Sequence, residues 1–314
     1  MYDLVIIGAG PGGLSAGLYA GRSRLNTLII EKDSVGGQIA ISDEIENYPG
    51  GKAGEPESGK ALTDRMKEQV ERFNVPIKKA NVSKVDLKGD VKKLELSDGE
   101  TIESKAVIIA TGANPRKLNV PGEKEFTTKG VSYCATCDGD FFTDLEVFVV
   151  GARNSAVEEA MYLTKFARKV TVLCRREKLR CDAIVEERAR DNDKLEIMYH
   201  TSIKEIRGSG VVDQLLLVNN ETGEEWVYDA DEDDGLLGVF VFIGYDPNNE
   251  LIKDQVELDE SGYIITDEKM RTNLKNVYAI GDIRNTVLRQ VITAAADGSI
   301  AAVTVEKELK ELDY

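Results

Sequence analysis

The chain has 314 residues, enough for two domains, and its 42% hydrophobic and 31% charged residues are ordinary for a globular protein. A formal net charge of −16 argues against nucleic-acid binding, because phosphates attract dense Lys and Arg. No apolar run approaches the roughly 20 residues that cross a bilayer, and the N-terminus lacks the basic region and cleavage site of a signal peptide. We therefore expect no membrane association and a cytoplasmic location.

Strand and helix patterns alternate along the first part of the chain, which is typical of an α/β fold with parallel sheets. A short apolar strand at 4–7 leads into a glycine turn and a helix over 14–20. A second buried strand at 27–30 ends in Glu31. The pattern then predicts a surface helix at 57–74, strands at 79–87 and 92–97, and a fully apolar strand at 106–110.

The same order of elements begins again near residue 145. It predicts a strand at 145–150, a turn at Gly151, a helix at 156–166 and a strand at 170–173. Alternation over 195–200 predicts a strand that contains His200, the single histidine. A strand at 276–282 and a helix at 291–309 close the chain. Two such openings indicate two nucleotide-type domains, joined by short strands near residues 115 and 245.

The first glycine turn has the fingerprint of a dinucleotide site, Gly8-Ala9-Gly10-Pro11-Gly12-Gly13. Gly8 permits the tight turn, Gly10 lets the backbone approach a pyrophosphate, and Gly13 allows close packing of helix on strand. The helix N-terminus supplies free N–H groups, and Glu31 is correctly spaced to bond a ribose hydroxyl. The strand, the helix and the acid together favour a nucleotide site over a plain turn.

The second glycine turn, Gly151-Ala152-Arg153-Asn154-Ser155-Ala156, departs from this fingerprint. Arg153 stands where the backbone normally approaches phosphate, so its side chain either blocks a pyrophosphate or reaches around to bind it. The following strand ends in Cys174-Arg175-Arg176, where an acid would favour NAD and arginines favour the 2′-phosphate of NADP. Arg175, Arg176 and Arg180 therefore indicate that NADPH is bound.

Positive charges crowd a stretch just after this second turn. The seven are Lys165, Arg168, Lys169, Arg175, Arg176, Lys178 and Arg180. One interpretation is a solvated helix face and loop. The position of the stretch favours a site for phosphate or for an acidic partner.

Four cysteines occur, and two of them form Cys134-Ala135-Thr136-Cys137-Asp138. In a reducing cytosol a Cys-x-x-Cys pair is redox-active or metal-binding. Zinc commonly needs four ligands, which the remaining Cys174, Cys181 and His200 do not supply at the usual spacing, so we expect no metal. The short spacing holds both sulfurs at bonding distance, one thiol can be acidified at a helix start, and Asp138 is placed to shuttle a proton. For Cys174 and Cys181 the interpretations are two unreactive residues or a second disulfide.

With these motifs, the chain resembles the low-molecular-weight thioredoxin reductases of bacteria over nearly its whole length. The matching segments, besides 131–139 around the dithiol, are Gly36-Gly37-Gln38, Ile45-Glu46-Asn47-Tyr48-Pro49-Gly50, Ala110-Thr111-Gly112-Ala113, Phe242-Ile243-Gly244, Ala279-Ile280-Gly281-Asp282 and Leu288-Arg289-Gln290. The resemblance implies two Rossmann-like domains, an FAD domain over 1–114 and 245–314 and an inserted domain over 115–244. The inserted domain would resemble an NADPH-binding domain and carry the Cys-x-x-Cys.

The resemblance also implies roles for individual residues. FAD would be held by Gly8, Gly10, Pro11, Gly12, Gly13, Glu31, Gly37, Gln38, Asn47, Thr111, Gly112, Gly281, Asp282, Arg289 and Gln290. Cys137 would exchange electrons with the flavin, Cys134 would attack the disulfide of thioredoxin, and Asp138 would be the general acid. Members of the family are homodimers, and their inserted domain rotates between flavin and thioredoxin.

The chain departs from the family pattern in the donor site, where typical members have glycine at Arg153 and histidine at Cys174. The donor site expected here comprises Gly151, Arg153, Asn154, Ser155, Ala156, Arg175, Arg176 and Arg180. The predicted function is FAD-dependent reduction of thioredoxin, with NADPH favoured as donor. The alternatives are a ferredoxin-dependent thioredoxin reductase, a non-catalytic flavin redox sensor, and a reductase of another disulfide protein.

Overall fold

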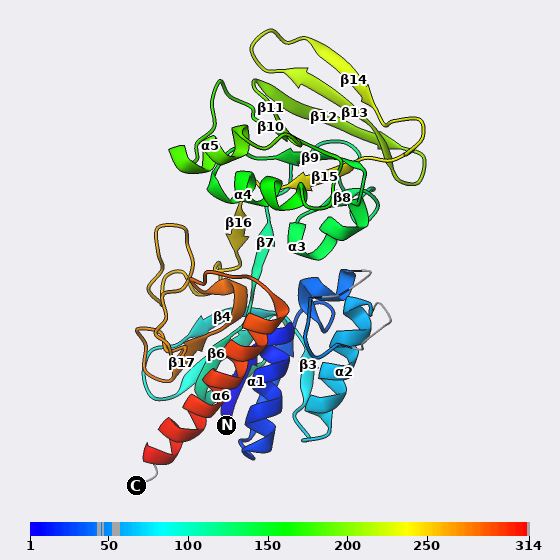
Figure 1. Cartoon of the computed structure of the whole chain (residues 1–314). Coiled ribbons are helices and arrows are strands. Elements are labelled where there is room, and N and C mark those ends of the chain that lie inside the picture. Colours follow the sequence, from blue (N-terminus) through cyan, green and yellow to red (C-terminus); the bar gives the residue numbers. More distant parts are fainter. Residues whose placement is uncertain (43–44, 46, 52–56, 313–314) are drawn as a thin grey trace. The chain divides into compact units, whose positions relative to one another are not determined.

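The computed structural model describes residues 1–42, 45, 47–51 and 57–312 (Figure 1). The chain divides into two compact units, unit 1 made of Met1–Asn114 and Asp246–Tyr314, and unit 2 made of Pro115–Tyr245. Two short strands, β7 (Ala113–Pro115) and β16 (Tyr245–Pro247), carry the chain from one unit to the other and pair with each other. Unit 2 is therefore an insertion between the two segments of unit 1.

Within its described residues, unit 1 is built on a seven-stranded sheet in the order β3-β2-β1-β6-β5-β4, with β17 also paired to β6. Its strands are β1 (Tyr2–Ile7), β2 (Thr27–Glu31), β3 (Ile77–Lys79), β4 (Val82–Asp86), β5 (Lys92–Leu96), β6 (Thr101–Ile109) and β17 (Val277–Ala279). The pairs among β1, β2, β3, β6 and β17 are parallel, whereas β4 and β5 form antiparallel pairs. The carboxyl ends of β1 and β2 therefore lie next to each other, at the expected nucleotide site.

Helices cover this sheet. They are α1 (Pro11–Arg22), α2 (Gly59–Glu71) and α6 (Val291–Leu312), with short 3-10 turns η1 (Gly37–Ile41) and η3 (Gly281–Ile283). Pro11 starts α1, where its fixed φ suits the first turn and its missing N–H costs nothing. The first and last helices lie side by side (Figure 1), and the Ser15 hydroxyl donates to the Ala295 carbonyl at 2.7 Å. This contact joins the two segments of unit 1.

The apolar run over residues 4–7 of β1 follows from burial on both faces of the sheet. Leu4 and Ile6 belong to one hydrophobic cluster together with Leu14 of α1, whereas Val5 and Ile7 belong to another on the opposite face. All five side chains are buried, and burial stabilises the fold by about 1.5–3 kcal/mol for each large aliphatic side chain. The part of a strand that is covered on both sides has no polar positions, which is typical of parallel sheets.

Unit 2 contains a parallel sheet in the order β11-β10-β9-β15-β8 and a separate antiparallel sheet in the order β12-β13-β14. Its strands are β8 (Val131–Ser132), β9 (Glu146–Val150), β10 (Lys169–Leu173), β11 (Leu195–Met198), β12 (Thr201–Gly208), β13 (Val212–Asn219), β14 (Glu225–Asp229) and β15 (Gly238–Val241). Its helices are α3 (Ala135–Asp138), η2 (Gly139–Phe142), α4 (Asn154–Leu163) and α5 (Ala183–Arg190). The two units thus confirm the α/β fold class.

The antiparallel sheet of unit 2 was not predicted, and it explains why residues 147–150 of β9 are all apolar. Val147 and Val149 pack in the cluster that contains α4, whereas Phe148 packs with residues of β12 and β13. The ring of Phe148 also meets Tyr228 of β14 edge to face, with 4.8 Å between centroids. The second sheet therefore covers the face that α4 leaves open.

The prediction of a strand through His200 is wrong at that residue. Strand β11 ends at Met198, and His200 has a left-handed φ of 51° in the turn before β12. The chain has to reverse its direction there, which takes the residue out of the sheet. Among the described residues no helix is both long and apolar enough to span a bilayer.

Candidate active site

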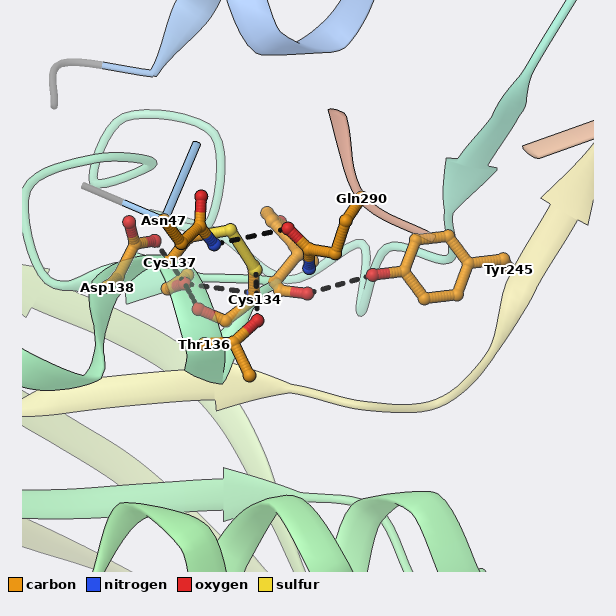
Figure 2. The surroundings of a disulfide bond; sticks show 9 residues. Asn47, Cys134, Thr136, Cys137, Asp138, Tyr245 and Gln290 are labelled. Carbon is orange, nitrogen blue, oxygen red and sulfur yellow. Dashed lines mark hydrogen bonds between the residues drawn. A yellow bond between two sulfur atoms is a disulfide. The ribbon is translucent and has the colours of Figure 1, made fainter. Parts of the chain in front are cut away.

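Cys134 and Cys137 form a disulfide in unit 2, as their spacing predicts (Figure 2). Their Cα atoms lie 5.3 Å apart across the single turn of α3, and Cys134 precedes that turn in an extended conformation. The Thr136 hydroxyl lies 3.5 Å from the Cys134 sulfur. Both cysteines are partly exposed, so a disulfide of another protein has access to them.

Ser132, at the end of β8, joins the dithiol to its acid. Its hydroxyl donates to a carboxylate oxygen of Asp138 at 2.5 Å and accepts the Cys134 N–H at 3.1 Å. The serine is buried and Asp138 is partly buried, so these bonds are shielded from water. This serine was not among the predicted site residues, although it lies two positions before the first cysteine.

Tyr133 is fixed immediately before the first cysteine. Its hydroxyl donates to Glu123 at 2.8 Å, and Lys117 lies over its ring, with the ammonium nitrogen 3.5 Å from the centroid. Burial and the bond to Glu123 raise the pKa of the Tyr133 phenol, which therefore stays a donor. The Tyr245 hydroxyl donates to the Tyr133 carbonyl at 2.9 Å (Figure 2). The backbone that leads into Cys134 is thus held on both sides.

The first fingerprint lies between β1 and α1 of unit 1. Gly8 has a left-handed φ of 109°, and a Cβ there would lie 2.3 Å from the Ala110 carbonyl oxygen. A Cβ on Gly10 would meet nothing within 4 Å, and no side chain caps the helix that Gly10 precedes. Gly8 is therefore required by the fold, whereas Gly10 leaves open space before the free N–H groups of α1. Pro11, Gly12 and Gly13 form the first turn of that helix.

Glu31, at the end of β2, lies where the ribose acid is expected. One carboxylate oxygen accepts the Ala9 N–H at 2.7 Å, and the other accepts the Asp33 N–H at 2.9 Å. The same carboxylate lines a pocket of about 240 Å³ between β2, β3 and α2. Each oxygen keeps a second lone pair, so Glu31 can still accept a hydroxyl from a ligand.

Four predicted cofactor residues lie in the loops of unit 1. Gly37 begins η1, and the amide of Gln38 donates to the Ala113 carbonyl and, at 3.1 Å, to Asn114. The Asn47 amide donates to Gln290 at 3.2 Å, which brings two distant predicted residues together. Glu46 of the same motif lies outside the described residues.

The other predicted cofactor residues lie near the ends of β6 and β17. Thr111 donates to the Asn248 carbonyl at 2.9 Å, and Gly112 has a left-handed φ of 70°. Gly281 and Asp282 form η3, directly after β17. The guanidinium of Arg289 lies over the Tyr263 ring, 4.3 Å from its centroid.

Asp282 is the most perturbed carboxyl group of this site. Burial raises the pKa of Asp282 to about 6, with Arg289 opposing the shift and Asp297 adding to it. Asp297 is held by the Gly281 N–H at 3.1 Å and by Arg284 at 3.2 Å. A buried carboxyl with a perturbed pKa is typical of a functional site, where a ligand group can compensate for the lost hydration.

The second fingerprint joins β9 to α4 in unit 2. Gly151 is buried, Arg153 precedes the helix in an extended conformation, and its side chain is exposed. Ser155 and Ala156 lie in the first turn. Two hydrogen bonds join Asn154 and Asp182. The Asn154 amide nitrogen donates to the Asp182 carboxylate at 2.8 Å, and the Asn154 amide oxygen accepts the Asp182 N–H at 2.7 Å. The loop after β10 is therefore fixed against the start of α4.

The basic stretch separates into two groups by its contacts. Lys165 lies over the Tyr162 ring, Arg168 pairs with Asp234 at 2.6 Å, and Lys169 pairs with Glu196 at 2.9 Å. The second group consists of Arg175, Arg176, Lys178 and Arg180. Arg153 is counted with this group because it is paired with Arg180 in a β-bridge. These five side chains are exposed and, within the described part of the chain, make no hydrogen bond or ion pair. The solvated-face interpretation fits the first group better than the second.

Cys174 and Cys181 are free thiols at either end of this loop. Cys174 is fully buried, and its sulfur lies 3.3 Å from the Lys178 carbonyl. Burial and the neighbouring Glu186 raise the pKa of the Cys181 thiol. The raised pKa lowers the thiolate fraction of Cys181, and burial keeps Cys174 from other reactants, which together favour the interpretation that these are unreactive residues.

The sequence profile of the pyridine nucleotide-disulphide oxidoreductases matches residues 2–298. The chain belongs to this family. Within it, thioredoxin reductases of Peptoclostridium litorale and Peptoclostridium acidaminophilum are 53% and 50% identical to the chain. The alignments cover 99% and 98% of this chain and 98% and 96% of those proteins.

A solved member of the family has the same fold. The thioredoxin reductase from Streptococcus pyogenes is 45% identical, with a TM-score of 0.92 and coverage of 99% of both chains. These matches confirm the resemblance inferred from the motifs, and they extend through both units. The chain is therefore an oxidoreductase of the disulphide-reducing type.

Proposed function

We propose that the chain is an FAD-dependent thioredoxin-disulfide reductase. The observation that carries this proposal is the partly exposed disulfide Cys134–Cys137, with Asp138 beside it, in a chain aligned end to end with thioredoxin reductases. A redox sensor that only records oxidation has the same disulfide. The full-length similarity to named reductases favours catalysis over that alternative.

Unit 1 is proposed to bind FAD, and unit 2 to bind the electron donor and carry the dithiol. The open space at Gly10, the uncapped start of α1 and the pocket at Glu31 suit a pyrophosphate and a ribose. Gln38, Asn47, Asp282, Arg289 and Gln290 are the polar groups that would hold the rest of the molecule. FAD, when bound, supplies a carrier that takes up two electrons and can pass them to a disulfide.

The reduced dithiol then acts by thiol–disulfide exchange. The Cys134 thiolate attacks one sulfur of the thioredoxin disulfide, so a mixed disulfide forms and the other thioredoxin sulfur leaves as a thiolate. Asp138 delivers a proton to this leaving thiolate. The Cys137 thiolate next attacks the Cys134 sulfur, which restores the internal disulfide and releases the second thioredoxin sulfur as a thiolate that takes up a proton from water. Two electrons pass to thioredoxin, and Cys137 would be the sulfur that accepts electrons from bound FAD.

For the electron donor we favour NADPH over ferredoxin. Support comes from Arg175, Arg176 and Arg180, which are exposed beside the second fingerprint and make no side-chain ion pair among the described residues. Guanidinium groups bind phosphate bidentately, as the 2′-phosphate of NADPH requires. We further propose a cytoplasmic homodimer.

An anaerobic titration with NADPH, followed by the flavin absorbance, tests the donor. We expect bleaching, and then turnover when oxidised thioredoxin is added. Absence of bleaching at millimolar NADPH, together with bleaching by reduced ferredoxin, would favour the ferredoxin-dependent alternative. Failure of the chemically reduced protein to reduce thioredoxin would refute the proposed function. Testing other disulfide proteins in the same assay, such as a peroxidase, distinguishes the remaining alternative.

A further inference from the structure

Arg153 and Arg180 are brought together by the backbone. The two residues are partners in a parallel β-bridge, and the Arg180 N–H donates to the Ala152 carbonyl at 2.7 Å. Residues paired across such a bridge lie side by side, with their side chains on the same face. Arg153 directly precedes α4 in the turn after β9, and Arg180 lies in the loop after β10, so the pair presents two guanidinium groups at the start of α4.

Two adjacent positive charges repel each other unless an anion lies between them. The chain carries 56 acidic residues, yet no described carboxylate pairs with either guanidinium. Asp182, which is close in sequence, bonds to Asn154 instead. An uncompensated pair in such an acidic protein indicates that the counter-charge comes from a ligand.

The position of the two arginines indicates which ligand they bind. In a doubly wound sheet the pyrophosphate of a dinucleotide lies at the helix that follows the first strand, where a glycine normally lets the backbone approach. Arg153 occupies that glycine position, so a cationic side chain stands where the bare backbone would normally approach the phosphates. We propose that Arg153 and Arg180 form a guanidinium clamp that holds the pyrophosphate of a nicotinamide dinucleotide through side chains.

This inference rests on the proposed function and refines its donor site. In this arrangement Arg180 binds the pyrophosphate. Arg175 and Arg176, which follow the end of β10, bind the 2′-phosphate. The two pairs then have separable effects. Loss of the clamp weakens every dinucleotide, whereas loss of the second pair weakens only the 2′-phosphorylated one.

Calorimetric binding of NADP⁺ and NAD⁺ to the oxidised, flavin-loaded protein tests the clamp. Loss of a charge-assisted contact in Arg153→Gln should weaken both ligands by the same factor, roughly ten- to a hundredfold. The affinity of Arg153→Lys for both ligands should lie between those of the unsubstituted protein and Arg153→Gln, because an ammonium keeps the charge and loses the bidentate geometry. Arg176→Gln should weaken NADP⁺ alone. The matched control is Lys165→Gln, from the same basic stretch but beyond the opposite end of α4, which should change neither affinity.

Three results would overturn the clamp. Unchanged or tighter binding in Arg153→Gln would mean that Arg153 blocks the site. A loss confined to NADP⁺ would place Arg153 at the 2′-phosphate. Absence of dinucleotide binding to the unsubstituted protein, with electrons accepted from an acidic iron–sulfur protein, would assign the cations to protein docking. In each case, thioredoxin reduction by the photoreduced protein shows separately whether the proposed function stands.

Discussion

Replacing Ser132 by alanine removes the bridge between the dithiol and its acid. The variant loses the 2.5 Å bond to Asp138 and leaves the Cys134 N–H without the acceptor it has at 3.1 Å. A hydrogen bond to a charged group contributes about 1.5–3 kcal/mol, and this one favours the carboxylate over the carboxylic acid. Loss of this bond should therefore weaken the carboxylate form of Asp138 by up to this amount, so the group should hold its proton to higher pH in the variant.

The assay is the single-turnover rate at which the reduced protein reduces thioredoxin, measured across pH. In Ser132→Ala, the limb of the profile that depends on Asp138 should move to higher pH. Thr201→Ala is a matched control, because it also removes a buried hydroxyl from unit 2, one that bonds to the Tyr199 carbonyl at 2.8 Å. That control should lower stability without moving the profile.

The reasoning is refuted by a profile that does not move in Ser132→Ala, or that moves to lower pH. A shift that persists in an Asp138→Asn background would also refute it, because the serine would then act through another group. If Ser132 acts only through this carboxylate, adding Ser132→Ala to Asp138→Asn leaves the position of the profile unchanged.

Two further predictions concern unit 1. Gly8→Ala should lower the free energy of unfolding by about 1 kcal/mol or more, which is the cost of a strained backbone position. Gly10→Ala should change the free energy of unfolding of the flavin-free protein by no more than about 0.5 kcal/mol, and it should weaken FAD binding. Equal losses of stability in the two variants would contradict the division of roles between these glycines. In the flavin-free protein, burial raises the pKa of Asp282 from 3.8 to about 6, so the folded state keeps this proton to higher pH than the unfolded state does. The free energy of unfolding should therefore fall by about 3 kcal/mol as pH rises from 3.8 to about 6. Denaturant unfolding of Asp282→Asn should lack this pH-dependent loss, and an unchanged pH dependence in that variant would contradict the prediction.

The sequence predicts the parts of this fold that repeat a local pattern. The apolar strand before Gly8 and the helix after it form a unit whose signal lies within a few residues, and the same holds around Gly151. The antiparallel strands β12–β14 were not predicted. These strands cover Phe148 of the parallel sheet. That contact joins segments far apart in the sequence, so no local pattern predicts it.

The candidate site also contains features that a local pattern predicts and features that depend on distant segments. The dithiol and its acid are adjacent in sequence, so spacing alone predicts their chemistry. The environment of Asp282 depends on Arg289 and Asp297, which other segments supply. The pairing of Arg153 with Arg180 depends on the path of the loop after β10. Contacts between separate loops have no periodic signal, and they are what the sequence could not predict.

The central claim, that Cys134 attacks thioredoxin and Cys137 resolves the complex, is tested most directly by trapping the mixed disulfide. Thioredoxin with its second active-site cysteine replaced by serine is activated at the first, mixed with reduced protein and analysed by mass spectrometry. We predict a stable covalent complex with Cys137→Ser and none with Cys134→Ser. A complex formed only by Cys134→Ser, or by neither variant, would contradict the account.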